Sequence, residues 1–260
     1  THPVAVARIL VDMECDSDSV IAALSHDLIE DTAITAQEIK KAFGSDVLEL
    51  VEGVPKLSKL NFSTKEEQQV ENLRKMLLAM AKDIRVILIK LADRLHNIRT
   101  LQYMPEKKRR EKAHETMQIF APLAHRLGMQ RVKMELEDTA LRYLDPVGYK
   151  EIEGKIREFV PKGEAVLEGI KRRIGKRMQE QKINYTIESR IKQVYSIYRK
   201  MYTQNRAFEE IYDLYAVRII VDNVIECYNA LGIIHDMFRP IPGRFKDHIS
   251  TPKPNMYQSL

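Results

Sequence analysis

The sequence predicts a multidomain protein in three parts: an all-α domain over residues 1–145, a helical connector over 146–181 and an α/β segment over 182–260. Three observations support this division. Apolar residues recur at helical spacing in the first part, where glycine is sparse. Asp145-Pro146-Val147-Gly148 then interrupts the helical pattern. From about residue 182 onward, alternating and β-branched runs indicate strands.

The elements of the first part follow from periodicity and capping residues. Helices are expected around 4–10, 19–24 and 84–98, and one further helix is expected to carry residues 24–31. Thr35 and Glu38 have the spacing of a capping box, which would open the next helix. The amphipathic pattern of 40–51 is interrupted at Phe43-Gly44.

The later elements are of mixed type. The connector is charged, and Pro161-Lys162-Gly163 is expected to interrupt its helix. Strands are expected at 185–189 and 213–221, and a helix at 224–238. Between the strands, a helix is expected to carry Ser196 and Lys200, which are four residues apart, with Arg190 and Lys192 just before it.

A histidine and three carboxylates fall within the six residues from His26 to Asp31. Burying several charges together is unfavourable unless a cation or ligand compensates them. Distant segments offer further nitrogen and oxygen ligands, which together suit a first-row divalent metal without choosing among manganese, iron, zinc and nickel. The alternative is that His26 and Asp27 form an ordinary cap or core hydrogen bond. The predicted ligand set is His2, His26, Asp27 and Asp93.

A second group of polar residues lies in the α/β segment. Cations before a helix start suit a triphosphate, because backbone amides there add to the attraction. A carboxylate at the start of the next strand, Asp213, suits Mg²⁺. A solvated basic surface explains each of these clusters equally well.

These motifs resemble a known family. His-Pro at 2–3, His-Asp-x-x-Glu-Asp-Thr at 26–32 and Lys-Leu-Ala-Asp-Arg-Leu-His-Asn at 90–97 look like the HD-type hydrolase domain of the RelA/SpoT enzymes, which make and destroy the alarmone (p)ppGpp. The resemblance covers almost the whole chain. It continues through 56–60, 66–69, 74–76 and 120–128.

The resemblance implies an HD-type hydrolase domain, a connector and the N-terminal part of a (p)ppGpp synthetase domain with a nucleotidyltransferase-like fold. The implied activity is that of a Mn²⁺-dependent guanosine-3′,5′-bis(diphosphate) 3′-pyrophosphohydrolase, taken from a bifunctional enzyme that also transfers pyrophosphate from ATP to GTP or GDP. Glu30 and Asp31, one turn past the ligands, are the expected catalytic residues, which would orient water and move protons. Asn97 and Thr100 are expected to line the nucleoside pocket.

For the synthetase domain, the resemblance implies three sets of residues. Asp213 would bind Mg²⁺, and Tyr257 would stack on the guanine base. Arg-Phe-Lys-Asp at 244–247 resembles the bifunctional branch, and the family's catalytic glutamate is expected beyond Leu260. The residues expected to bind ATP are Arg190, Lys192, Ser196 and Lys200; those on the GTP/GDP side are Arg244, Lys246, Lys253, Asn255 and Tyr257.

Composition limits the alternatives. The 260 residues are 44% hydrophobic and 30% charged, with a net charge of +5, which suits a polyphosphate but also RNA or an acidic partner. Two cysteines and no membrane-length apolar run favour a cytoplasmic protein that does not enter a membrane. The rival functions are an HD phosphohydrolase for another nucleotide and a basic module that binds RNA or ribosomes; for the enzyme, ribosome or RNA contact is expected only through regions outside this chain.

Overall fold

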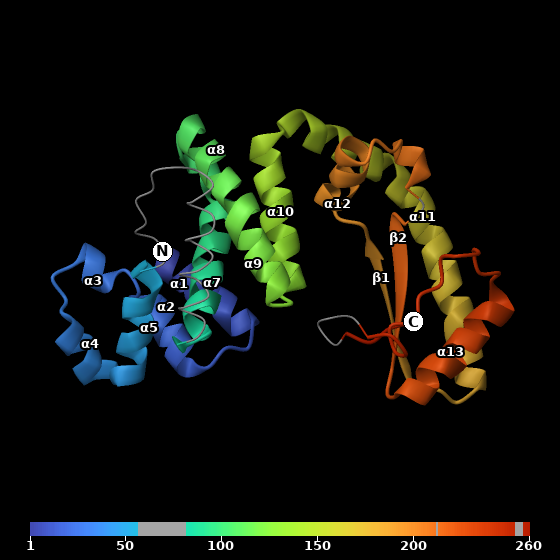
Figure 1. Ribbon diagram of the computed structural model, residues 1–260, viewed down its shortest axis with the longest axis horizontal. Coiled ribbons are helices and arrows are strands. Elements are labelled where there is room, and N and C mark those ends of the chain that lie inside the picture. Colours follow the sequence, from blue (N-terminus) through green and yellow to red (C-terminus); the bar gives the residue numbers. More distant parts are fainter. Residues whose placement is uncertain (57–81, 212, 253–256) are drawn as a thin grey trace. The chain divides into compact units, whose positions relative to one another are not determined.

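The computed structural model describes residues 1–56, 82–211, 213–252 and 257–260, without the side chains of residues 30, 55, 56 and 160–162. These residues divide into two compact units, Thr1–Asp145 and Pro146–Leu260 (Figure 1). The second unit includes the expected connector, so the three-part division of the chain stays a prediction. No helix among these residues has the length and apolar composition needed to cross a membrane.

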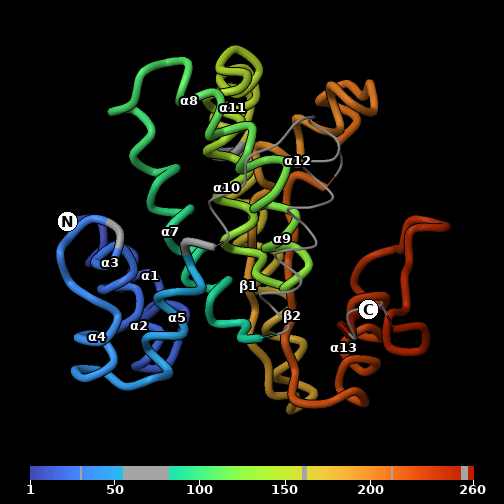
Figure 2. Tube along the Cα trace, turned by 60° about the vertical axis from the view of Figure 1, so that its left-hand side comes forward, coloured from blue at the N-terminus to red at the C-terminus, as the bar shows by residue number. Residues whose placement is uncertain are grey.

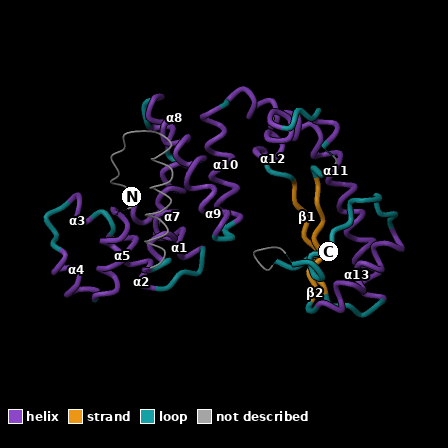
Figure 3. The backbone as a smooth tube through the Cα atoms, in the orientation of Figure 1, coloured by secondary structure: helices purple, strands orange, loops and turns teal. Residues whose placement is uncertain are grey.

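All regular elements among the described residues of the first unit are helices, joined by loops and turns, as expected (Figure 3). The capping box at Thr35 and Glu38 is confirmed, and Gly44 separates two helices as the pattern indicated. Two views agree that the N-terminal helices gather together (Figures 1 and 2). The elements are α1 (His2–Asp12), α2 (Ser17–Ser25), α3 (Leu28–Asp31), α4 (Ala36–Phe43), α5 (Ser45–Lys56), α7 (Arg85–Arg99), η1 (Leu101–Tyr103), α8 (Glu106–Glu115), η2 (Thr116–Phe120), α9 (Ala121–Arg126) and α10 (Gln130–Leu144).

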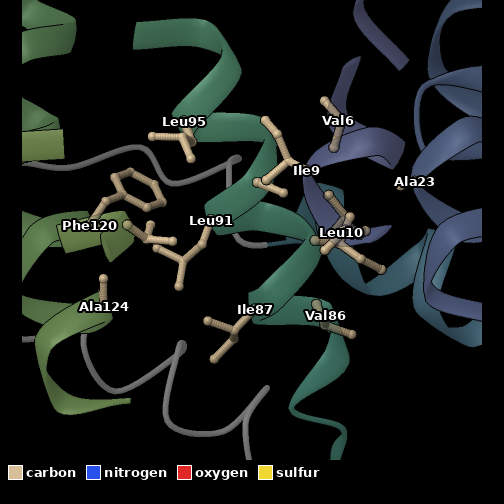
Figure 4. Packing of buried hydrophobic residues seen from close by; sticks show 14 of the residues in the cluster. Val6, Ile9, Leu10, Ala23, Val86, Ile87, Leu91, Leu95, Phe120 and Ala124 are labelled. Carbon is tan, nitrogen blue, oxygen red and sulfur yellow. The ribbon is translucent and has the colours of Figure 1, made fainter. Parts of the chain in front are cut away.

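Helix α7 is the central element of this unit. Its apolar residues enter one continuous core with those of its neighbours, α1, α2, α5, α10 and η2. In Figure 4, Leu91 and Leu95 lie on the side of α7 that faces Phe120, whereas Ile9 and Leu10 of α1 approach from the other side. Because α7 is buried on both sides, polar groups along it are held in fixed positions.

A buried arginine ties α7 to the helices beside it. Arg94 is 6% exposed, and its Nη1 lies 3.0 Å from Oε2 of Glu115 in α8. Its guanidinium carbon lies 4.1 Å from the centre of the Phe120 ring. A buried charge requires such a partner, so this pair fixes α7 relative to α8 and η2.

The prediction of one helix over residues 24–31 is wrong. Helix α2 ends at Ser25 and α3 begins at Leu28, which leaves His26 and Asp27 in a turn. The imidazole Nδ1 of His26 lies 2.7 Å from the Ala23 carbonyl oxygen and donates to it. This local side-chain bond lies at the point where regular helical hydrogen bonding is interrupted.

The second unit combines a long helix with an antiparallel pair of strands. The strands pair from Tyr185↔Val221 to Ile191↔Tyr215. Alternate residues of both strands pack with α11 and α13, which places the two helices on one face of the sheet. The expected strands and the helix after residue 223 are confirmed. The elements are α11 (Pro146–Glu180), β1 (Tyr185–Ile191), α12 (Val194–Tyr198), η3 (Arg199–Thr203), η4 (Phe208–Glu210), β2 (Tyr215–Val221) and α13 (Val224–Met237).

The expected break of the connector helix at residues 161–163 is wrong, because α11 continues through them. One proline removes a single helical hydrogen bond, and packing on the sheet outweighs that loss. A Cβ at Gly163 would lie 2.3 Å from the Tyr215 ring, so glycine lets this ring approach the helix backbone. The Tyr215 hydroxyl donates to the Phe159 carbonyl at 2.9 Å.

Gly53 of α5 makes a close approach that positions α7. A Cβ there would lie 2.8 Å from Cγ2 of Val86, a buried β-branched residue that has little freedom to rotate. We expect Gly53→Ala to destabilise the protein by about 1–3 kcal/mol, offset by up to about 1 kcal/mol of helix propensity. Urea unfolding measures the change.

Two further variants make this prediction specific. A Cβ at Gly154 in α11 would have no atom within 4 Å, so Gly154→Ala should leave stability unchanged or increase it. In a Val86→Ala background, the Gly53→Ala change should cost less. An equal cost in both backgrounds would show that Val86 is not the obstacle.

Candidate metal centre

Three side chains of the first unit converge on one point. His2, His26 and Asp93 each offer a ligand atom, and these atoms lie within 4.8 Å of one another. They come from the start of α1, the turn between α2 and α3, and the middle of α7. Segments far apart in sequence are therefore brought together by the packing of α1 and α2 against α7.

The orientation of His26 is set by its own helix. A carbonyl oxygen only accepts, so the bond from Nδ1 to Ala23 requires that Nδ1 carry the hydrogen. When the ring is neutral, the lone pair is then on Nε2. Nε2 lies 3.2 Å from Oδ1 of Asp27, whose side chain is partly exposed. Asp27, the fourth predicted ligand, thus adjoins the three-residue group through His26.

Asp93 is the buried charge of the site, at 5% exposure. Its Oδ2 accepts a hydrogen bond from Nζ of Lys90 at 2.7 Å, and its Oδ1 accepts one from Nδ2 of Asn97 at 2.6 Å. Burial alone raises the pKa of this carboxyl, but the bonds to His2 and Lys90 outweigh it and hold the pKa well below its usual range. Asp93 is therefore ionised at neutral pH.

His2 lies between this carboxylate and a third histidine. Its Nε2 is 3.2 Å from Asp93 Oδ1, and its Nδ1 is 2.7 Å from Nδ1 of His96. The hydrogen bond to Asp93 raises the pKa of His2 although burial opposes it. Burial and the nearby charge of His2 lower the pKa of His96.

The donor set fits a divalent first-row metal. Metal–ligand bonds of about 2.0–2.2 Å place neighbouring ligand atoms roughly 3 Å apart, close to the 3.2 Å between His2 and Asp93. Two imidazoles with one or two carboxylates match the ligand preference of such metals. The ammonium group of Lys90 already contacts Asp93, which shows that the site attracts positive charge.

The other expected hydrolase residues surround this group. Asp31 is exposed at the end of α3, and its backbone N–H donates to the Asp27 carbonyl at 2.8 Å. The side chain of Glu30 lies outside what the structure describes. Asn97 is bonded to Asp93, and Thr100 donates to the carbonyls of His96 and Asn97 where α7 ends. Their catalytic and nucleoside-binding roles stay predictions.

Sequence reasoning gave no role to Lys90 or His96, although both stand in the quoted motif. Lys90 precedes Asp93 by three residues and His96 follows it by three. On a helix, this spacing places all three side chains on one face. The spacing was therefore the signal that could have identified them.

In the second unit, two of the expected ATP-binding residues converge on Asp213. Nζ of Lys192 lies 2.7 Å from its Oδ2, and Nζ of Lys200 lies 2.6 Å from its Oδ1. Burial opposes the shift, but the two lysines lower the pKa of Asp213 to about 2. The single helix expected to carry Ser196 and Lys200 is replaced by α12, which carries Ser196, and the π-helix η3, which carries Lys200. The Ser196 hydroxyl donates a hydrogen bond to Oε1 of Gln193 at 3.3 Å.

The expected guanine-side residues are only partly described. Arg190 of β1 and Tyr257 border the same cavity, formed with α11, α13 and β2. Arg244 and Lys246 are exposed in the segment after α13. Asp247 accepts hydrogen bonds from the backbone of residues 249 and 250. Lys253 and Asn255 lie outside the described residues.

Lys90 offers a direct test of the charge balance at Asp93. Replacing it with methionine leaves a buried carboxylate with one strong partner fewer, so Lys90→Met should destabilise the chelator-treated protein by about 1–3 kcal/mol. Added Mn²⁺ should recover part of that loss. Thermal and urea unfolding measure both effects.

The double variant Lys90→Met/Asp93→Asn is the control. Removing the charge together with its partner should cost less than the sum of the two single changes. Additive costs would mean that Lys90 does not stabilise the ionised carboxylate.

Comparison with known proteins places two family regions along the chain. Residues 1–130 match the HD domain model, and residues 189–260 match the region found in RelA/SpoT proteins. The chain is 52% identical over its whole length to a probable guanosine-3′,5′-bis(diphosphate) 3′-pyrophosphohydrolase of Synechocystis, and covers 34% of that protein. It is 46% identical, again over its whole length, to GTP pyrophosphokinase rsh of Brucella ovis, and covers 35% of it.

The chain therefore spans about a third of the length of these curated relatives. A solved structure described as a metazoan ortholog of SpoT that hydrolyzes ppGpp is 26% identical to this chain. The alignment covers 58% of this chain and 79% of the chain in that structure. Its TM-score of 0.34 supports no argument about fold. From the two matching family regions and the identities over its full length, the chain belongs to the RelA/SpoT family, with an HD domain ahead of the RelA/SpoT region.

Proposed function

We propose that this chain is the catalytic region of a bifunctional enzyme and acts as a metal-dependent (p)ppGpp 3′-pyrophosphohydrolase. The observation that carries the proposal is the convergence of His2, His26 and the ionised, buried Asp93 in an HD domain. The relative from Synechocystis bears the name of that activity. We assign the metal as Mn²⁺ and Asp27 as its fourth ligand.

The reaction transfers the 3′-pyrophosphoryl group to water. The water oxygen bonds to the phosphorus attached to the ribose 3′-oxygen, the bond from that phosphorus to the 3′-oxygen breaks, and the 3′-oxygen takes up a proton. Pyrophosphate and GDP or GTP are released. His2, His26 and Asp93 would hold a divalent cation, which would lower the pKa of a nearby water and polarise a phosphate oxygen.

The chain's own residues orient the ligands and move the protons. Ala23 fixes the imidazole of His26, and Lys90 and Asn97 fix Asp93. We assign water orientation and proton transfer to Glu30 and Asp31, which follow the His26-Asp27 turn in α3.

We assign the nucleoside pocket to the end of α7. Asn97 and Thr100 lie there, next to the metal group. A substrate bound at this end would present its 3′-diphosphate toward Asp93 and the two histidines. This arrangement is compatible with the hydrogen bond that Asn97 already makes to Asp93, because the amide oxygen is not used in that bond.

We propose a nucleotide role for the second unit as well. Lys192 and Lys200 would exchange Asp213 for the phosphates of ATP, which would free the carboxylate to hold Mg²⁺. Arg190 and Ser196 complete the ATP side. On the GTP or GDP side we place Arg244, Lys246, Lys253, Asn255 and Tyr257.

Product analysis tests the hydrolase proposal. Chelator-treated protein is incubated with ppGpp, with and without Mn²⁺, and products are resolved by ³¹P NMR. We expect pyrophosphate and GDP in equal amounts, and only with metal. Orthophosphate release would indicate another phosphohydrolase reaction, and no turnover of ppGpp alongside turnover of a different nucleotide would favour the rival HD enzyme.

Asp27 tests the fourth ligand. Asp27→Ala removes the carboxylate next to His26 Nε2, so we expect loss of stoichiometric metal and loss of hydrolysis. Metal content after gel filtration, read by mass spectrometry, measures the first effect. The exposed Asp12 of α1 provides the matched control, Asp12→Ala, which should keep its metal. An Asp27→Ala protein that retains one tightly bound metal would remove Asp27 from the ligand set.

Glu30 tests the proton-transfer assignment. Glu30→Gln keeps the side-chain size but removes the ionisable group, so turnover should fall by about two to four orders of magnitude while the metal stays bound. Steady-state rates and metal content are measured together, with Glu111→Gln on the exposed face of α8 as control. If Glu30→Gln instead loses the metal without unfolding, Glu30 is a ligand and not a proton-transfer group.

A further inference from the structure

The contact between His2 and His96 joins two nitrogens of the same kind. Their Nδ1 atoms lie 2.7 Å apart, with ring centres 4.7 Å apart and ring planes at 64°. Two lone pairs at this distance repel, and so do two N–H groups. The contact is therefore favourable only when one ring donates its hydrogen and the other accepts it.

The metal site decides which ring donates. Nε2 is the atom of His2 that faces Asp93, so it is the atom that faces a cation held there. A neutral imidazole that binds a cation through Nε2 carries its hydrogen on Nδ1. His2 is then the donor, and His96 accepts through Nδ1 and keeps its own hydrogen on Nε2.

The two histidines find their hydrogen-bond partners in different places. The acceptor for His26 is close in sequence: it is the carbonyl of Ala23, three residues earlier. The acceptor for His2 comes instead from α7, the helix that also carries Asp93 three residues before His96.

We propose that His96 is a positioning residue, which accepts the Nδ1 hydrogen of His2 and thereby holds the tautomer and ring orientation in which His2 Nε2 faces the metal. The proposal rests on the metal site of the proposed function but not on the identity of the substrate. Hydrogen-bonding partners of ligating histidines typically change metal affinity by about 10- to 100-fold when removed.

Calorimetric titration of the chelator-treated chain with Mn²⁺ tests the proposal through binding alone. His96→Leu has no acceptor, so the Kd for Mn²⁺ should rise by about 10- to 100-fold. His96→Asn places an amide oxygen near the position of Nδ1 and should recover most of the affinity. His114→Leu, on the exposed face of α8, is the control and should bind as the unaltered chain does.

The outcomes separate this proposal from the proposed function. An unchanged Kd in His96→Leu, or equal weakening in His96→Leu and His96→Asn, overturns the role of His96. If the expected order of affinities holds but ppGpp is not hydrolysed, the positioning role stands and the assigned substrate is wrong. Should His96→Leu fail to fold, His96→Gln replaces it, because its longer side chain carries the amide away from the Nδ1 position.

Discussion

The burial of one ionised carboxylate, Asp93, is the constraint on which the first unit depends. A charge at 5% exposure is tolerated only with partners, and Asp93 has three: the ammonium group of Lys90, the amide of Asn97 and the imidazole of His2. Two of them come from α7 itself, at helical spacings of three and four residues. The third comes from α1, so the charge balance of α7 requires that α1 pack correctly against it. The geometry of the candidate metal site is therefore linked directly to the packing of the domain.

The second unit compensates the charge of its carboxylate, Asp213, in a different way. Asp213 is held by Lys192 and Lys200, but all three side chains reach solvent, where such ion pairs contribute little to stability. Exchange of partners is correspondingly easy at Asp213 and difficult at Asp93. This contrast supports the proposals of a metal centre in the first unit and of a nucleotide site in the second unit that exchanges its ion-pair partners.

Local signals in the sequence predicted much of this organisation. The capping box at Thr35, the strands before residues 192 and 222 and the helical character of the first unit follow from periodicity and capping, which act between near neighbours. The failures have different origins. The turn at His26 coincides with a local side-chain bond to Ala23, whereas α11 continues past residues 161–163 and packs on a sheet that the local pattern does not reveal. The partnership of His2 with His96 joins residues 94 apart, which no local rule identifies.

The central claim is that a divalent metal binds where His2, His26 and Asp93 converge. A crystal structure of the chain with Mn²⁺, with anomalous scattering recorded at the manganese edge, tests it most directly. We predict one strong anomalous peak in contact with Nε2 of His2, Nε2 of His26 and Oδ1 of Asp93. A peak elsewhere with this group vacant, or a peak held through Nδ1 of either histidine, would contradict the account.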